Sequence, residues 1–210
     1  YRVCEYSIYK HTPEAEVKPL KQDVLRKEGH YTRAKDELSS TEFTFTRFLV
    51  PYLNSYNGVA LFCDCDFIFT SNVQELFDLY NDKYAVMVCK HDYTPTNTIK
   101  MDGRVQTTYP KKNWSSLMLW NCNHPKNKIL TPELINKETG KFLHRFEWLE
   151  EEDIGSIPIN WNWLVGWYKE PQNGKPKAIH YTEGGPWFED YKNCEYADVW
   201  SNYKNQIHNI

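Results

Sequence analysis

The chain has 210 residues, a formal net charge of −3 and a pI of about 6.2. This length suits one domain with a substantial core, and the charge excludes the global basic field that attracts nucleic acid or anionic membranes. We therefore expect no nucleic-acid partner. The sequence has no signal-peptide pattern and no apolar run of membrane length, so we also expect no transmembrane segment.

The apolar pattern predicts helices and strands that alternate along the whole chain. Helices are expected at 2–10, from the capping box Ser39-x-x-Glu42 to Tyr52, at 73–80 and at 196–207. Strands are expected at 17–20, 59–63, 85–89, 117–120, 157–165 and 178–181. The strand–helix–strand order over 59–89 predicts a right-handed crossover between a parallel pair. The expected architecture is one α/β domain over 1–210, with a mainly parallel central sheet flanked by helices.

Six cysteines are scattered through the sequence without a Cys-x-x-Cys pair, and several lie inside apolar runs. This pattern predicts free thiols in a reducing compartment, and hence a cytoplasmic location, which would be a host cytoplasm if the source is viral. The first residue is not Met, and the chain opens directly on a helix-like segment. We therefore expect that something upstream of residue 1 is missing or was trimmed.

The stretch that organises the rest is the apolar strand Val59–Cys63, which ends at Asp64 and Asp66. Side chains at i and i+2 of an extended segment point the same way, so both carboxylates can reach one cation. Carboxylates beyond a strand's carboxyl end lie where open α/β sheets bind ligands, and a hard divalent metal stabilises such a pair. The alternative is a strand followed by a polar turn, because Asp-x-Asp alone is common.

Further candidate groups each have a structural alternative. His180, after a short strand, is either a third ligand beside the carboxylates for Mn²⁺ or a buried structural residue. Gly184 and Gly185 either let backbone amides approach a phosphate or turn the chain.

Charged residues add three more candidates. The run Glu150–Asp153 is either a solvated face or is partly drawn into the fold by its apolar flanks. Lys111–Ser116 carries cations and hydrogen-bonding groups that suit sugar hydroxyls or phosphates, or it is a plain basic loop. Arg47 lies in a mostly apolar segment and needs an anionic partner if it is buried.

Taken together, these stretches resemble a GT-A-fold glycosyltransferase, and they are similar to a bacterial and phage group related to the family 8 retaining transferases. The resemblance covers nearly the whole chain, and its specificity lies in the order and spacing of several motifs. They are Thr44–Pro51, Leu61–Asp66, Ala85–Asp92, Lys112–Ser116, Glu152–Gly155 and Ile179–Trp187.

The resemblance implies a hexosyltransferase that uses a UDP-sugar donor, with glucose or galactose favoured, a carbohydrate or glycoconjugate acceptor, and Mn²⁺ or alternatively Mg²⁺. Asp64, Asp66 and His180 match the family's metal ligands. The implied donor-binding residues are Arg47, Cys65, Asp92, Lys112, Asn113, Ser115, Ser116, Gly184 and Gly185. Glu152 matches the position beneath the anomeric carbon, and Glu151 and Asp153 would contact sugar and acceptor hydroxyls.

The implied chemistry is transfer with retention, together with some donor hydrolysis. Glu152 would act as electrostatic support for front-face attack, or as a nucleophile if the intermediate is covalent. This sequence departs from the family at Gly185, where family 8 members usually carry a lysine that neutralises the diphosphate. The metal, the backbone of Gly184 and Gly185, or Lys112 would have to compensate. The chain also begins after the family's first strand, which normally contacts the uracil, so the resemblance implies that this strand is missing upstream of residue 1.

Two other classes of protein also fit parts of the sequence. A haloacid-dehalogenase-type phosphatase uses Asp-x-Asp after an apolar strand, but its motif wants Thr or Val where this chain has Ile68. A non-catalytic sugar-binding module explains the eight tryptophans, but not a carboxylate pair with a distant histidine. Binding of UDP strengthened by metal separates the transferase from both.

Overall fold

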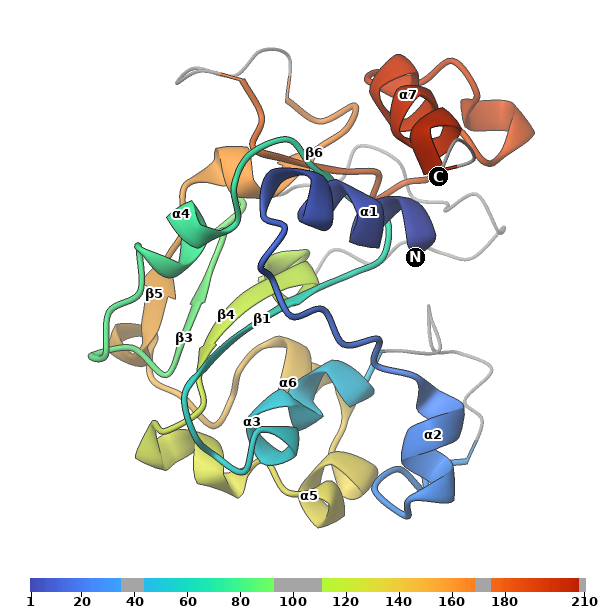
Figure 1. Cartoon of the computed structure of the whole chain (residues 1–210). Coiled ribbons are helices and arrows are strands. Elements are labelled where there is room, and N and C mark those ends of the chain that lie inside the picture. The colour runs from blue at the N-terminus through green and yellow to red at the C-terminus, as the bar shows by residue number, and fades with distance from the viewer. Residues whose placement is uncertain (35–43, 93–110, 169–174, 208–210) are drawn as a thin grey trace.

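In the computed structural model, which describes residues 1–34, 44–92, 111–168 and 175–207, a four-stranded sheet forms the centre of the molecule (Figure 1). Its strand order is β1 (Val59–Cys63), β4 (Leu117–Asn121), β3 (Val86–Val88) and β5 (Ile154–Ser156). The α/β fold class predicted from the apolar pattern is therefore confirmed. Side chains alternate along β1, so that Phe62 faces one side of the sheet and Leu61 the other.

The strand pairing differs from the predicted mainly parallel sheet. β1 and β3 run in the same direction, but β4 lies between them and is antiparallel to both; only β3 and β5 form a parallel pair in this sheet. The prediction of an adjacent parallel pair was wrong because strand–helix–strand order does not reveal a third strand inserted from later in the chain. The five consecutive buried residues of β4 suit this central position.

A second, smaller sheet follows directly from the first. It has the order β2 (Phe67–Phe69), β7 (Ala178–His180) and β6 (Trp163–Leu164), with β2 antiparallel to β7 and β6 parallel to it. The long edge strand predicted over 157–165 is instead a short 3₁₀-helix, Ile159–Trp161, followed by β6. The chain thus passes from the first sheet to the second between β1 and β2.

Helices cover both faces of the four-stranded sheet (Figure 1). One face packs against α1 (Arg2–His11) and α4 (Gln74–Phe77). The other packs against a larger group that includes a 3₁₀-helix: α2 (Gln22–Lys27), η1 (Thr46–Leu49), α3 (Val50–Leu53), α5 (Pro132–Lys137) and α6 (Gly140–His144). The closing helix α7 (Ala197–Ile207) packs against α1, where Tyr203 Oη lies 2.7 Å from His11 Nε2.

Most of the predicted helices occur; α1 is one residue longer than predicted, α7 is one residue shorter, and α4 is reduced to Gln74–Phe77. The capping box Ser39–Glu42 lies outside the described residues, and the segment after it forms η1 and then α3. Pro51 causes no kink, because it lies in the first turn of α3, where a missing N–H leaves no bond unmade. The short strand predicted over 17–20 is not formed, and those residues belong to no helix or strand.

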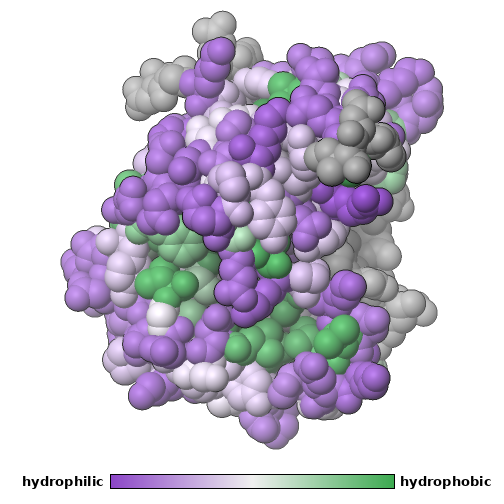
Figure 2. All heavy atoms as spheres, viewed as in Figure 1, coloured by the Kyte–Doolittle hydropathy of each residue, from purple (hydrophilic) through white to green (hydrophobic). Residues whose placement is uncertain are grey.

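The visible face of the molecule is mostly hydrophilic, with smaller hydrophobic areas in its lower half (Figure 2). Among the residues that the structure describes, no helix is both long enough and apolar enough to cross a bilayer. All six cysteines are free thiols; Cys4, Cys89 and Cys122 are buried and Cys65 is exposed.

Candidate functional site

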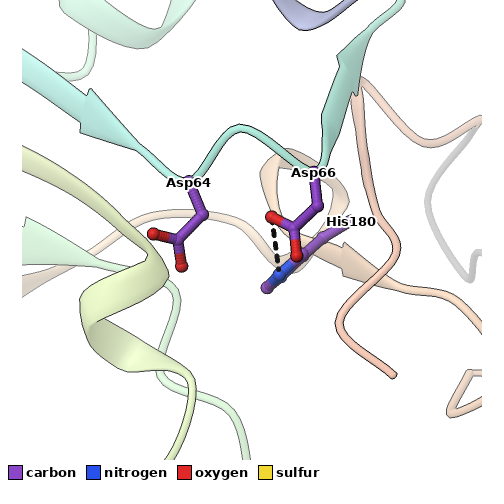
Figure 3. Close-up of side chains that lie close together, drawn as sticks. All are labelled: Asp64, Asp66 and His180. Atoms are coloured by element: carbon purple, nitrogen blue, oxygen red, sulfur yellow. Dashed lines mark ion pairs between the residues drawn. The ribbon is translucent and has the colours of Figure 1, made fainter. Parts of the chain in front are cut away.

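Three of the predicted residues converge where the two sheets meet (Figure 3). Asp64 directly follows β1, Asp66 directly precedes β2, and His180 ends β7. One ligand atom from each residue lies within 4.8 Å of those of the other two. Two carboxylates and one imidazole thus face a common point, which is the arrangement that the sequence predicted.

Backbone hydrogen bonds to both sheets hold the two aspartates in place. Asp64 N donates to the Ser116 carbonyl at 2.9 Å, and Tyr181 N donates to the Asp66 carbonyl at 3.0 Å. The segment between them is a turn and not the extended strand on which the i, i+2 argument rested. The carboxylates converge because the turn joins two sheets, and not because of strand alternation.

Arg47 forms a bidentate ion pair with Asp64. Its two terminal nitrogens lie 2.9 and 3.1 Å from the two carboxylate oxygens, and one of them also donates to the Ser115 carbonyl at 2.9 Å. The guanidinium is buried, so the anionic partner that the sequence required is Asp64. Burial raises the pKa of Asp64; Arg47 opposes this rise, and the neighbouring Asp66 carboxylate adds to it.

Asp66 and His180 form the other half of the cluster. Burial disfavours the ionised Asp66, but attraction to His180 and Arg47 outweighs it and lowers the pKa of this carboxyl. Apart from His180 Nε2, at 3.5 Å, Asp66 Oδ1 has no hydrogen-bond donor within the described chain, although it is buried. The imidazole stacks on Phe67, with ring centroids 4.2 Å apart, so its plane is fixed.

A buried asparagine connects His180 to the loop before β4. Asn162 Oδ1 lies 2.9 Å from His180 Nδ1, and Asn162 Nδ2 donates to Ser116 Oγ at 2.9 Å. Ser116 Oγ in turn donates to the Asn113 carbonyl at 2.7 Å. Asn162 has no exposed surface. The sequence predictions missed this residue, because an asparagine between two tryptophans gives no signal of a site.

The donor set fits a hard or borderline divalent cation. Carboxylate oxygens with one imidazole suit Mn²⁺ and also accommodate Mg²⁺. A buried carboxylate oxygen without a donor is an unfavourable arrangement that a cation removes. Asp64 keeps lone pairs free beside its two bonds to Arg47, because an ionised carboxylate accepts about four hydrogen bonds.

The loop Lys112–Ser116 borders this cluster. Asn113 has a left-handed backbone conformation, with φ of 63°, which turns the chain into β4. Lys112, Ser115 and Ser116 are buried. Ser115 Oγ lies 2.7 Å from Nδ1 of His144 in α6, another residue that the sequence predictions missed.

The remaining expected donor contacts are distributed around the cluster. Cys65 is exposed in the turn between the two aspartates. Gly184 has a φ of 141° and donates to the Tyr181 carbonyl, while an added Cβ at Gly185 would lie 2.2 Å from the Trp187 ring. Gly185 is therefore required by packing. Asp92 is exposed just after His91, whose Nδ1 lies 2.7 Å from Tyr168 Oη.

The structure does not bring the predicted catalytic acids to the cluster. The run 150–153 precedes β5, which is parallel to β3, and the Asp153 carbonyl accepts from Ala85 N at the start of β3. Asp64 lies at the opposite edge of the same sheet, beyond the pair Cys63–Leu117. Asp153 is bound to Lys126 at 2.5 Å, and Glu151 pairs with Lys111. The role of Glu152 beneath the anomeric carbon stays a prediction from the family resemblance.

Comparison with solved structures gives the same fold. The chain resembles the apo-form glycosyltransferase GlyE of Streptococcus pneumoniae TIGR4, with a TM-score of 0.61 and 16% identity over 96% of this chain and 56% of that one. It also resembles the WbbM bifunctional glycosyltransferase, with a TM-score of 0.61 and 14% identity over 96% and 46% of the two chains. An active-site mutant of LgtC matches with a TM-score of 0.52 and 10% identity, over 97% and 90%.

These likenesses show the GT-A-type fold, and they do not single out family 8. The chain spans only about half of the GlyE and WbbM structures. No protein-family model matches the sequence. A curated relative of much higher identity is Protein CDI of Arabidopsis thaliana, which is 56% identical over 207 residues, 96% of this chain and 80% of that protein. The chain therefore belongs to the family of Protein CDI, and it has a GT-A-type fold.

Proposed function

We propose that this protein is a metal-dependent glycosyltransferase that moves a hexose from a UDP-sugar to a carbohydrate or glycoconjugate acceptor. The observation that supports this most is the convergence of Asp64, Asp66 and His180 at the junction of the two sheets of a GT-A-type fold. The solved structures of similar fold are glycosyltransferases, and one of them, galactosyltransferase LgtC, was crystallised with donor and acceptor sugar analogs.

The metal would be held by Asp64, Asp66 and His180, with Mn²⁺ favoured and Mg²⁺ as the alternative. A bound divalent cation would stabilise the negative charge that develops on the departing nucleoside diphosphate. The family resemblance assigns donor contacts to Arg47, Lys112, Asn113, Ser115 and Ser116. In the described chain Arg47 acts mainly through Asp64, whose carboxylate it fixes at both oxygens.

We infer that transfer proceeds with retention by front-face attack. The acceptor oxygen forms a bond to the anomeric carbon as the bond from that carbon to the diphosphate oxygen breaks, and the acceptor proton passes to the departing phosphate. This route requires no carboxylate beneath the sugar, in agreement with the position of the run 150–153 at the other sheet edge. Some donor hydrolysis follows when water replaces the acceptor.

The rival phosphatase reading is less consistent with the site. A phosphatase of that class would use Asp64 as its nucleophile, but here the Arg47 guanidinium is paired with that carboxylate, and Ile68 stands where the motif has Thr or Val. A cytoplasmic location is part of the proposal, and the six free thiols support it because cytosolic proteins keep their cysteines reduced.

Isothermal titration with UDP in the presence and absence of Mn²⁺ tests the proposal. We expect UDP to bind and the metal to increase its affinity by about tenfold or more, the scale of one charge-assisted contact. The same titration with a UDP-hexose, followed by assay of free UDP, tests donor hydrolysis. A protein that binds neither UDP nor Mn²⁺ is not this transferase.

A further inference from the structure

Asn162 is the buried link between the candidate metal ligand His180 and the loop before β4. It lies in the short segment between the 3₁₀-helix Ile159–Trp161 and β6, and its side chain has no exposed surface. Asn162 is not among the site residues that the sequence predicted. Each polar atom of its side chain nevertheless has a partner in the site.

The direction of each hydrogen bond that links the Asn113 carbonyl, Ser116, Asn162 and His180 is fixed. The Asn113 carbonyl can only accept, so Ser116 Oγ uses its one proton on it, at 2.7 Å. Ser116 Oγ must then accept from Asn162, which means that the Asn162 amide nitrogen faces Ser116 and its oxygen faces His180. An amide oxygen can only accept, so the proton of this last bond belongs to His180 Nδ1.

This assignment determines what His180 presents to the site. A neutral imidazole carries one proton, so with Nδ1 protonated the Nε2 atom has a lone pair. Nε2 lies 3.5 Å from the buried Oδ1 of Asp66. Two acceptors therefore face each other across this gap, and a cation between them resolves the repulsion.

We propose that Asn162 is a positioning residue that holds His180 in the Nδ1–H tautomer, and so prepares Nε2 to bind a divalent cation together with Asp66. This inference rests on the metal site of the proposed function. Without the amide oxygen, Nδ1–H has no acceptor. The imidazole then gains a hydrogen bond by carrying its proton on Nε2 and donating it to Asp66. That proton then competes directly with the cation, and the loop Asn113–Ser116 loses its link to the metal ligand.

Three substitutions separate the orienting role from simple packing. Asn162→Leu keeps the volume and removes both hydrogen bonds. Asn162→Asp keeps an oxygen acceptor for Nδ1–H and loses the amide donor to Ser116 Oγ and to the Asn113 carbonyl. The control is Asn127→Leu, because Asn127 is equally buried but its amide donates to the Ala85 and Asn121 carbonyls, at the end of the central strands that is opposite Asp64.

The first measurement is the tautomer of His180 in the metal-free protein, by two-bond ¹H–¹⁵N NMR at about pH 8.5, where imidazole is ordinarily neutral. We expect Nδ1–H in the wild type, Asn162→Asp and Asn127→Leu, and a shift to Nε2–H in Asn162→Leu. Wild-type His180 in the Nε2–H form would overturn the inference. This readout requires neither metal nor donor, and a structural role alone does not change it.

The second measurement is Mn²⁺ affinity by calorimetry, without nucleotide. We expect Asn162→Leu to bind about 10- to 100-fold more weakly, the usual effect of losing a partner of a metal-bound histidine. Asn162→Asp and Asn127→Leu should stay within about threefold of the wild type. Equal affinity in the wild type and Asn162→Leu would overturn the inference and leave the proposed function intact. If Asn162→Leu does not fold, Ser116→Ala replaces it, with a smaller loss expected in the same direction.

The two failures remain distinguishable. If the wild type binds no Mn²⁺, the metal site of the proposed function fails, and the role of Asn162 in metal binding fails with it. The tautomer then still decides the orienting role: Nδ1–H in the wild type and Nε2–H in Asn162→Leu support it, and any other result overturns it.

Discussion

The two edges of the four-stranded sheet both carry carboxylates, and they use them differently. At the edge beyond β1, Asp64 and Asp66 face a histidine, and a buried oxygen of Asp66 has no donor other than that ring among the described residues. At the edge before β5, Asp153 accepts from Lys126 at 2.5 Å and from Glu150 N at 2.8 Å. The difference teaches that a buried carboxylate oxygen without a hydrogen-bond donor indicates a binding site, whereas a run of several acids does not.

The largest effect that tests this difference is expected when one acid is removed from each edge. Asp66→Ala should abolish the increase of about tenfold or more that Mn²⁺ gives to UDP affinity, because it deletes a direct metal ligand. Asp153→Ala should leave the metal effect unchanged and lower stability, because it removes the cap of a short helix before β5. Calorimetry and urea unfolding measure the two effects. A metal effect that survives in Asp66→Ala would reject the ligand assignment.

The basic side chains that pair with these acids also differ between the two edges. Arg47 is 6% exposed and holds Asp64 by two bonds, whereas Lys126 is 44% exposed beside Asp153. Arg47→Met leaves a largely buried carboxylate without its partner, so we expect a loss of about 3 kcal/mol in the free energy of unfolding. Mn²⁺ should restore part of this loss, because it replaces the missing positive charge. Lys126→Met should have a much smaller effect, which Mn²⁺ does not change. Urea unfolding with and without Mn²⁺ tests both variants.

The parts of the fold that sequence predicts here are those with strong local patterns. The apolar run Val59–Cys63 and the helical spacing of 196–207 give β1 and α7 close to their bounds. The order of the strands was not predictable, because β4 reaches its place between β1 and β3 from beyond the segment 93–110. Strands of two or three residues, such as β6, are too short to show any period.

The residues of the candidate site also fall into those that a local sequence pattern identifies and those that it does not. Asp64 and Asp66 are identified by their place at the end of an apolar strand, and the family resemblance adds His180. Asn162 and His144 act through hydrogen bonds to residues far away in the sequence, so no local pattern marks them. The role of Glu152 comes from a short acidic match to the family and stays a prediction; the parallel register of β3 and β5 puts the run 150–153 along the edge strand opposite β1.

Histidines that follow the two central strands, at opposite ends of the sheet, provide a smaller test. Burial lowers the pKa of His91, beyond β3, to about 3, with His180 adding to the effect. The folded state therefore binds fewer protons than the unfolded chain between about pH 6.5 and 3, so stability is present above this range and is lost as pH falls through it. We expect His91→Gln to remove about 2 kcal/mol of the stability difference between about pH 7 and 5.

The control for this test is at the other end of the sheet. The pKa of His124, after β4, is also lowered by burial, but its ring is less buried, so His124→Gln should change the pH dependence less. Urea unfolding at both pH values measures each variant. Tyr168→Phe keeps the titrating ring of His91 and should retain the wild-type pH dependence. Equal pH dependence in the wild type and His91→Gln would contradict the assignment.

The smallest expected effect is at Glu152, and it decides which reading of the acidic run is correct. The family resemblance implies that Glu152→Gln reduces turnover by about two orders of magnitude, the cost of one preorganised electrostatic group. In the structure, Glu152 lies in the short 3₁₀-helix Glu151–Asp153, at the edge of the sheet opposite Asp64. The residues on either side of it form ion pairs, Glu151 with Lys111 and Asp153 with Lys126. We therefore expect turnover and Mn²⁺ affinity to change by less than about threefold, within the usual range for a surface substitution. Measured with a UDP-hexose, a large loss of turnover at unchanged affinity would return Glu152 to the reaction and would require that the run 150–153 reach the donor during catalysis.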